Sequence, residues 1–67
     1  MKWLSDGKDS FALEYEGEYV AAVSNIEQNG RRCWYWHSYV NGAEGFCDTL
    51  QQAQADAERA TTPQRLQ

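Results

Sequence analysis

A cysteine and the single histidine are the residues whose types could support nucleophilic chemistry. Cys33 and His37 lie four positions apart in a segment rich in Trp and Tyr, which is typical of a β-strand. At the rise of a strand their Cα atoms would lie roughly 13 Å apart, too far for a hydrogen bond between thiol and imidazole. We therefore expect a protein that is not an enzyme, and Cys33→Ser is the substitution that would test a nucleophilic role.

The same residue types are too few for a metal site. A zinc site needs about four ligands, and one histidine with two unclustered cysteines, Cys33 and Cys47, does not supply them. The two cysteines can form at most one disulfide, which favours reduced thiols in a cytosol. We expect no metal, no cofactor and a cytoplasmic location.

Acidic side chains are concentrated in the first half of the chain. Residues 1–30 hold six acids and two lysines, residues 31–67 hold four acids and four arginines, and the net charge is −4. Such a chain is repelled by nucleic acid phosphates and attracted to basic protein surfaces, including those that bind nucleic acid. We predict no direct binding of nucleic acid and a partner-binding acidic surface. Its candidate residues are Asp6, Asp9, Glu14, Glu16, Glu18 and Glu27.

Three of these acids have a second interpretation. Glu14, Glu16 and Glu18 surround an expected turn, where they could serve only as a solvated hairpin end. Acid–base catalysis is not indicated, because no apolar segment that could form a pocket accompanies them.

The elements that position these residues follow from the hydrophobic periodicity. A short leading strand or arm contains Trp3, which we expect at the edge of the core. Alternating apolar and polar residues, or runs of aromatic and β-branched residues, predict strands over 11–15, 19–26, 33–40 and 45–47. Two Asn-Gly pairs, at 29–30 and 41–42, are typical of hairpin turns between strands.

The last part of the chain has the periodicity of a helix. Residues 50–60 are strong helix formers with a narrow stripe of alanines, and Thr49 with Gln52 forms a capping box. The predicted fold class is α+β: an antiparallel three- to four-stranded meander sheet with one C-terminal helix packed on one face. We expect a single domain over 1–62 and a loose C-terminal tail over 63–67.

Strand register predicts which side chains face the helix. A two-residue turn at Asn29-Gly30 places Val23 opposite Trp36. The predicted helix-facing set is Phe11, Leu13, Tyr15, Tyr19, Ala21, Val23, Trp34, Trp36 and Val40. For the last strand two alternatives stay open, since the parity of the turn points Cys47 inward whereas side-chain volume favours Phe46.

The opposite face of the sheet is unusually apolar for a surface. It is expected to carry Val20, Ile26, Tyr35 and Tyr39, which predicts either a protein interface or the seam of a homodimer. Stacking of single-stranded nucleic acid on the tyrosines is a weaker alternative, because only Arg31 and Arg32 supply basic charge nearby. The protein is expected to be a monomer or a homodimer.

One segment resembles a known group of proteins. The motif Trp34-x-Trp36, then Asn41-Gly42, then Gly45-Phe46-Cys47-Asp48-Thr49-Leu50-Gln51-Gln52-Ala53 leading to Ala57-Glu58 resembles small sheet-plus-helix proteins common on bacteriophages and mobile elements. Some small acidic phage proteins of this build look like anti-CRISPR proteins that inhibit type I systems. The resemblance covers about residues 31–60, and it is more specific for fold than for function.

The resemblance implies inhibition by contact. Such a phage-encoded inhibitor would act in the cytoplasm of the bacterial host and present its acids, in place of DNA phosphates, to a basic DNA-binding site of a CRISPR-Cas subunit. The alternative is a small structural or regulatory phage protein that dimerises through its open aromatic sheet face. A membrane location is not expected, because no apolar run approaches roughly 18 residues.

Overall fold

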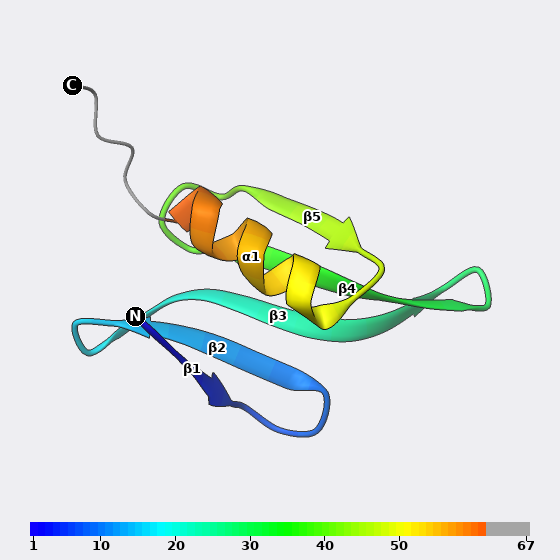
Figure 1. Ribbon diagram of the computed structural model, residues 1–67, viewed down its shortest axis with the longest axis horizontal. Helices are drawn as coiled ribbons and strands as arrows, with labels where there is room; N and C mark the ends of the chain where they lie inside the picture. Colours follow the sequence, from blue (N-terminus) through cyan, green and yellow to red (C-terminus); the bar gives the residue numbers. More distant parts are fainter. Residues whose placement is uncertain (62–67) are drawn as a thin grey trace.

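The computed structural model describes residues 1–61 and contains a five-stranded antiparallel sheet with one helix packed on it, an α+β fold (Figure 1). The sheet has one strand more than the three to four expected, because the leading segment forms a full edge strand. The strands lie in meander order and are β1 (Lys2–Ser5), β2 (Ser10–Tyr15), β3 (Glu18–Gln28), β4 (Arg31–Ser38) and β5 (Glu44–Cys47). The predicted domain end at residue 62 and the predicted tail over 63–67 lie outside the described residues.

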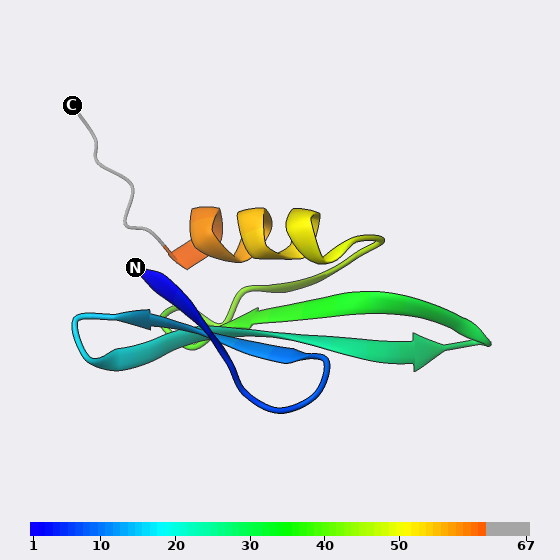
Figure 2. The ribbon, with the colours of Figure 1, turned by 60° about the horizontal axis from the view of Figure 1, so that its bottom comes forward.

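The helix α1 (Leu50–Thr61) covers one face of the sheet and leaves the other face open (Figure 2). It contacts β3, β4 and β5. The predicted capping box is present in its Thr49 half, since the hydroxyl of Thr49 accepts a hydrogen bond of 3.1 Å from the backbone N–H of Gln52, whereas the Gln52 side chain donates to Asp56 instead. Ala53 and Ala57 are fully buried, which lets the helix approach the sheet closely.

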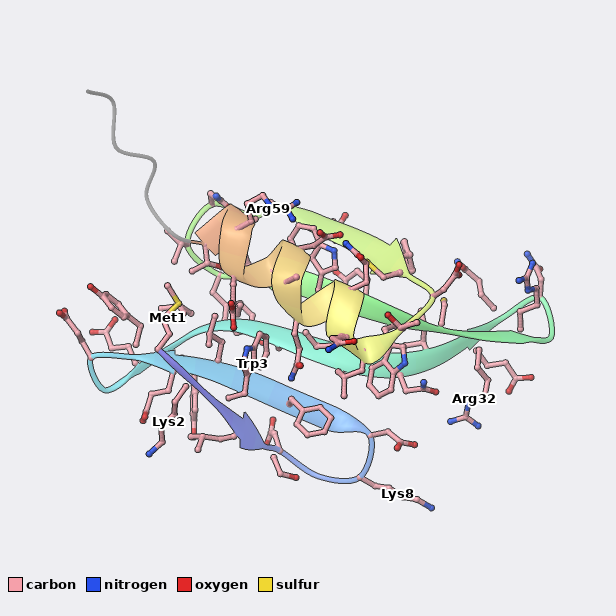
Figure 3. The ribbon with its side chains drawn as sticks, in the orientation of Figure 1. Met1, Lys2, Trp3, Lys8, Arg32 and Arg59 are labelled. Atoms are coloured by element: carbon pink, nitrogen blue, oxygen red, sulfur yellow. The ribbon has the colours of Figure 1, made fainter. Side chains whose placement is uncertain are left out.

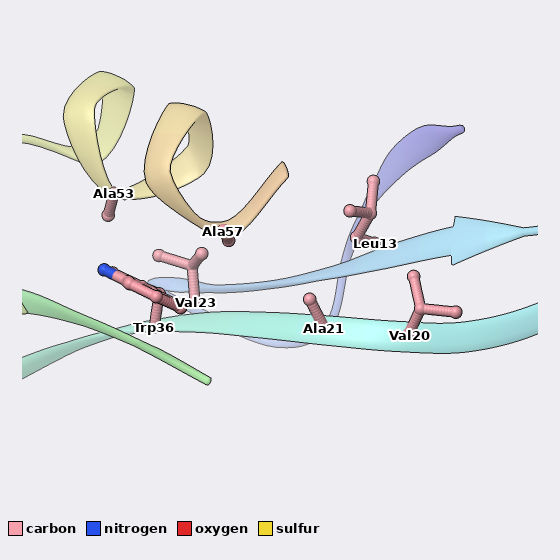
Figure 4. Close-up of a cluster of buried hydrophobic side chains, with 7 residues drawn as sticks. All are labelled: Leu13, Val20, Ala21, Val23, Trp36, Ala53 and Ala57. Carbon is pink, nitrogen blue, oxygen red and sulfur yellow. The ribbon is translucent and has the colours of Figure 1, made fainter. Parts of the chain in front are cut away.

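The β3–β4 hairpin has the predicted register. Asn29 and Gly30 both have positive φ, 54° and 77°, as a two-residue hairpin turn requires. Val23 therefore lies opposite Trp36, and both belong to the buried cluster under the helix (Figure 4). The members of this cluster are Leu13, Val20, Ala21, Val23, Trp36, Ala53 and Ala57.

Strand β5 resolves the alternative between Cys47 and Phe46. Cys47 pairs with the helix-facing Trp34 and packs against the core, whereas Phe46 lies on the open face with 54% of its surface exposed. The orientation of β5 agrees with the parity of the turn and not with side-chain volume. There is no room for a larger residue beside Trp36, since a Cβ on Gly45 would lie 2.7 Å from the indole nitrogen of Trp36. The Trp36 ring already occupies the space beside β5.

A β-bulge corrects two predicted orientations. Leu13 pairs with Ala21 but Glu14 pairs with Tyr19, so Val20 is an extra residue in β3. Val20 turns into the core and is 9% exposed, whereas Tyr19 moves to the open face and is 61% exposed. The prediction that Tyr19 faces the helix and Val20 the open face is wrong, because the bulge interrupts the strict alternation that the prediction assumed.

Two further residues predicted to face the helix are exposed. Tyr15 is the last residue of β2, and Val40 lies beyond Ser38, where β4 ends. They are 45% and 60% exposed, respectively. Both predictions are wrong because the two residues lie at strand ends, past the part of the sheet that the helix covers.

Candidate interaction surfaces

The hairpin of β2 and β3 carries three of the predicted acids at its turn: Glu14 near the end of β2, Glu16 in the turn and Glu18 at the start of β3, which we name the acidic end. Glu16 and Gly17 have positive φ, 53° and 83°, in a tight turn between paired strands. Within residues 1–61 no ion pair involves any of these three carboxylates. The nearest base by register is Lys2, the cross-strand partner of Glu14. The acidic end is therefore a set of three carboxylates at one end of a hydrogen-bonded hairpin, with Glu14 and Glu18 on opposite faces of the sheet by strand alternation.

The remaining predicted acids lie toward the other end of the sheet and among basic residues. Asp6 and Asp9 belong to the β1–β2 turn, which also holds Lys8, and Asp9 forms an ion pair of 3.4 Å with Arg32. Glu27 is the cross-strand partner of Arg32. Figure 3 shows Lys8 and Arg32 at the end of the sheet opposite Met1 and Lys2. The six acids do not form one surface, and the predicted acidic patch reduces to the acidic end.

The open face of the sheet carries a row of rings on β4, on β5 and just after the end of β4, the aromatic ridge, formed by Tyr35, His37, Tyr39 and Phe46. The centroids of Tyr35 and Phe46 are 5.2 Å apart, those of His37 and Tyr39 are 5.3 Å apart, and those of Tyr35 and His37 are 6.4 Å apart. Of the residues predicted here, Tyr35 and Ile26 are half-buried and Tyr39 is exposed. Phe46 and His37 complete the ridge. The sequence signal for Phe46 is strand alternation, because an inward-facing Cys47 places its neighbour Phe46 on the open face.

A polar contact orders the ridge. The Tyr35 hydroxyl donates a hydrogen bond of 2.5 Å to Glu44, and His37 Nδ1 lies 3.7 Å from the same carboxylate oxygen. Hydrogen bonding to Glu44 raises the pKa of Tyr35 above its ordinary value, because the phenol must keep its proton to donate. Tyr35 is therefore a neutral hydrogen-bond donor at physiological pH.

The two cysteines are free thiols on opposite faces of the sheet. Cys47 faces the helix, where its thiol donates to Asp56 over 3.2 Å, and burial together with that carboxylate raises its pKa to about 11. Cys33 lies on the open-face side and lines a hollow of about 290 Å³ with Arg31 and Phe46. Because their strand positions point apart, the two thiols cannot pair within one chain.

The structure does not bring a nucleophile and base together at Cys33. His37 contacts Tyr35, Tyr39 and Glu44, and it lies four residues beyond Cys33 on β4. No group of three or more metal-ligating side chains occurs within residues 1–61. No helix in the described part of the chain is long and apolar enough to cross a membrane.

Comparison of the chain with protein-family models, with curated proteins and with solved structures finds no match. Function is therefore inferred from the two surfaces described above, the acidic end and the aromatic ridge.

Proposed function

We propose that this chain is a non-catalytic protein that binds, through its acidic end, a protein partner whose basic surface normally binds nucleic acid. The observation that carries the proposal is the placement of Glu14, Glu16 and Glu18 on one hairpin, where none of the three forms an ion pair within the described residues and Lys2 is the one base beside them by register. Carboxylates held by a rigid element lose little conformational freedom on binding, so they can replace phosphates at a basic site. Occupancy of that site would exclude DNA.

The class of partner follows from the resemblance of residues 31–60 to small phage and mobile-element proteins. We propose a phage-encoded inhibitor of a DNA-targeting bacterial defence complex of the CRISPR-Cas type. The chain would act as a mimic of DNA charge in the host cytoplasm. The acidic end supports this role because its three acids outnumber Lys2, the one base beside them by register, and because Lys2 lies at the end of the sheet opposite Lys8 and Arg32 (Figure 3).

The test is a pull-down of a CRISPR surveillance complex by the purified chain, followed by competition with target double-stranded DNA. The triple variant Glu14→Gln, Glu16→Gln and Glu18→Gln should weaken binding at least tenfold and reduce its dependence on salt, because three charge contacts are removed without a change of side-chain size.

A matched control removes the same number of charges at the other end of the sheet. Asp6→Asn, Asp9→Asn and Glu27→Gln should leave the affinity within about twofold, since these acids lie beside basic residues. Equal loss in the two triple variants would show that only net charge matters and would contradict a role for the acidic end. Retention of the complex with DNA still bound would contradict charge mimicry.

A second function, that of a structural or regulatory protein that dimerises, is favoured by the exposure of the aromatic ridge. Tyr39 and Phe46 are more than half exposed, and no element of the described chain covers the open face (Figure 2). An exposed group of rings of this kind is typical of a contact surface.

A further inference from the structure

Large and small side chains occupy separate regions of the open face, as the pairing of the strands shows. Beside Tyr35 and His37 of the aromatic ridge, β2 and β3 carry small side chains, which we name the small-residue trough. The larger Glu14, Tyr19 and Ile26 border the trough on the same face. The trough consists of two cross-strand pairs, Ser10 with Ser24 and Ala12 with Ala22.

Ridge and trough are aligned in rows across the sheet. One row runs from Ser10 and Ser24 of the trough to Tyr35 and Phe46 of the ridge. The next row runs from Ala12 and Ala22 to His37 and Glu44. In each row two small residues on β2 and β3 are followed by two large residues on β4 and β5. The boundary between small and large therefore falls between β3 and β4.

This boundary makes the face complementary to itself. A two-fold axis can lie between the open faces of two copies, parallel to the strands and above the boundary between β3 and β4. Such an axis places β3 of one copy opposite β4 of the other copy, and β2 of one copy opposite β5 of the other. It places the ridge of each copy over the trough of the other. Two sheets that pack face to face lie about 10 Å apart, and large side chains opposite small ones fill that space without voids or clashes.

We propose that the open face binds a second copy of this chain, with each aromatic ridge seated in the partner's small-residue trough. The interface is isologous, as in most homodimers.

Charge on the open face permits this association in spite of the net charge of −4. By strand alternation the face carries two bases, Lys2 and Arg31, and two acids, Glu14 and Glu44, all on edge strands or at strand ends. The apolar centre is thus surrounded by a balanced polar rim, which is the usual anatomy of an interface. The inference rests on the open face, on which Glu14 is the one member of the acidic end, and it does not depend on Glu16 or Glu18.

The experiment is sedimentation equilibrium of the full chain over a wide concentration range. The expected mass rises from 7.7 kDa to twice that value with increasing concentration. Ala22→Arg places a charged side chain in the trough and should raise the dissociation constant at least tenfold. The matched control Ala55→Arg, on the exposed side of the helix, should leave the dissociation constant unchanged.

Two further variants test the geometry and guard against misfolding. Phe46→Ser removes a mostly exposed ring, so the monomer should keep its circular dichroism spectrum while dimerisation weakens. Ser24→Tyr fills the trough and should weaken dimerisation only if the partner's ridge sits there. A mass of 7.7 kDa at every concentration would overturn the proposal, as would a dimer that neither variant weakens.

Discussion

At the scale of single residues, the best-defined polar contact joins the sheet to the helix. Cys47, on β5, donates to Asp56, which also accepts hydrogen bonds from Gln52 and Arg59. Asp56 therefore connects β5 to the helix while two helical neighbours hold its carboxylate in place. Burial and this carboxylate both favour the protonated thiol of Cys47, so the contact depends on pH.

We predict that Cys47 reacts slowly with iodoacetamide until the pH approaches 11, when measured in a Cys33→Ser background. Asp56→Asn removes the nearest negative charge and should lower the pKa of Cys47. The rate of alkylation as a function of pH measures this value. Asp48→Asn, which removes a weaker and more distant influence, should lower it less.

The same pKa shift has a consequence for stability. The folded state holds the thiol proton more tightly than the unfolded chain, whose ordinary value is 9.0. This contribution to the free energy of unfolding is fully present below about pH 9 and is lost as the pH rises to about 11. Constant stability between these two pH values in the Cys33→Ser background would contradict it.

At the scale of elements, the pairing of β4 with β5 depends on a close approach. The indole of Trp36 lies against the backbone of Gly45, where no side chain fits. The loop before β5 is held by backbone hydrogen bonds of 2.8 and 3.0 Å between Ser38 and residues Ala43 and Gly42. Glycine is needed at position 45 for space rather than for backbone conformation, since its φ lies outside the positive region.

We predict that Gly45→Ala destabilises the protein by about 1–3 kcal/mol, because the added methyl group forces the Trp36 ring or β5 to move. Urea denaturation measures the loss. In a double-mutant cycle with Trp36→Phe, the smaller ring should relieve part of the clash, so the two effects should not be additive. Full additivity would show that the contact between positions 36 and 45 is not the cause.

Side-chain hydrogen bonds attach the helix to the sheet along its second half and at its C-terminal end. Trp3 Nε1 donates to Glu58 over 2.6 Å and joins β1 to the helix. At the C-terminal end, the Thr61 hydroxyl donates to the buried Ser38 hydroxyl over 3.2 Å. These contacts bring the first and last described elements together, which limits the freedom of the edge strand β1.

At the scale of the whole molecule, stability is expected to decrease from the centre of the sheet to its edges. Strands β3 and β4 each have two strand neighbours and also contact the helix, whereas β1 has one strand neighbour. We predict the slowest amide hydrogen exchange in β3 and β4, near Val23 and Trp36, and the fastest among the strands in β1. Two-dimensional NMR in D₂O measures the order, and equal protection of β1 and β3 would contradict it.

Much of the fold could be predicted from the sequence because its signals are local. The Asn29-Gly30 turn and the Thr49 cap depend on residues a few positions apart, and so does the alternation that orients Trp36. Each of these features follows from backbone geometry over a short stretch of chain, which the residue types alone specify. Parity counted from the Asn41-Gly42 pair favoured Cys47 toward the helix, but side-chain volume favoured Phe46, so the sequence left this alternative open and the structure decided it.

The tertiary structure decided what depends on distant contacts. The bulge at Val20 arises where β2 pairs with β3, and no residue type in that stretch signals it, so Tyr19 and Val20 exchanged faces. The separation of the acidic end from Asp9 depends on which turns meet at which end of the sheet. The ridge and the trough exist only because three strand registers bring Ser24 beside Tyr35 and Tyr35 beside Phe46. Such relations are set by packing between segments far apart in the chain, so no local pattern encodes them.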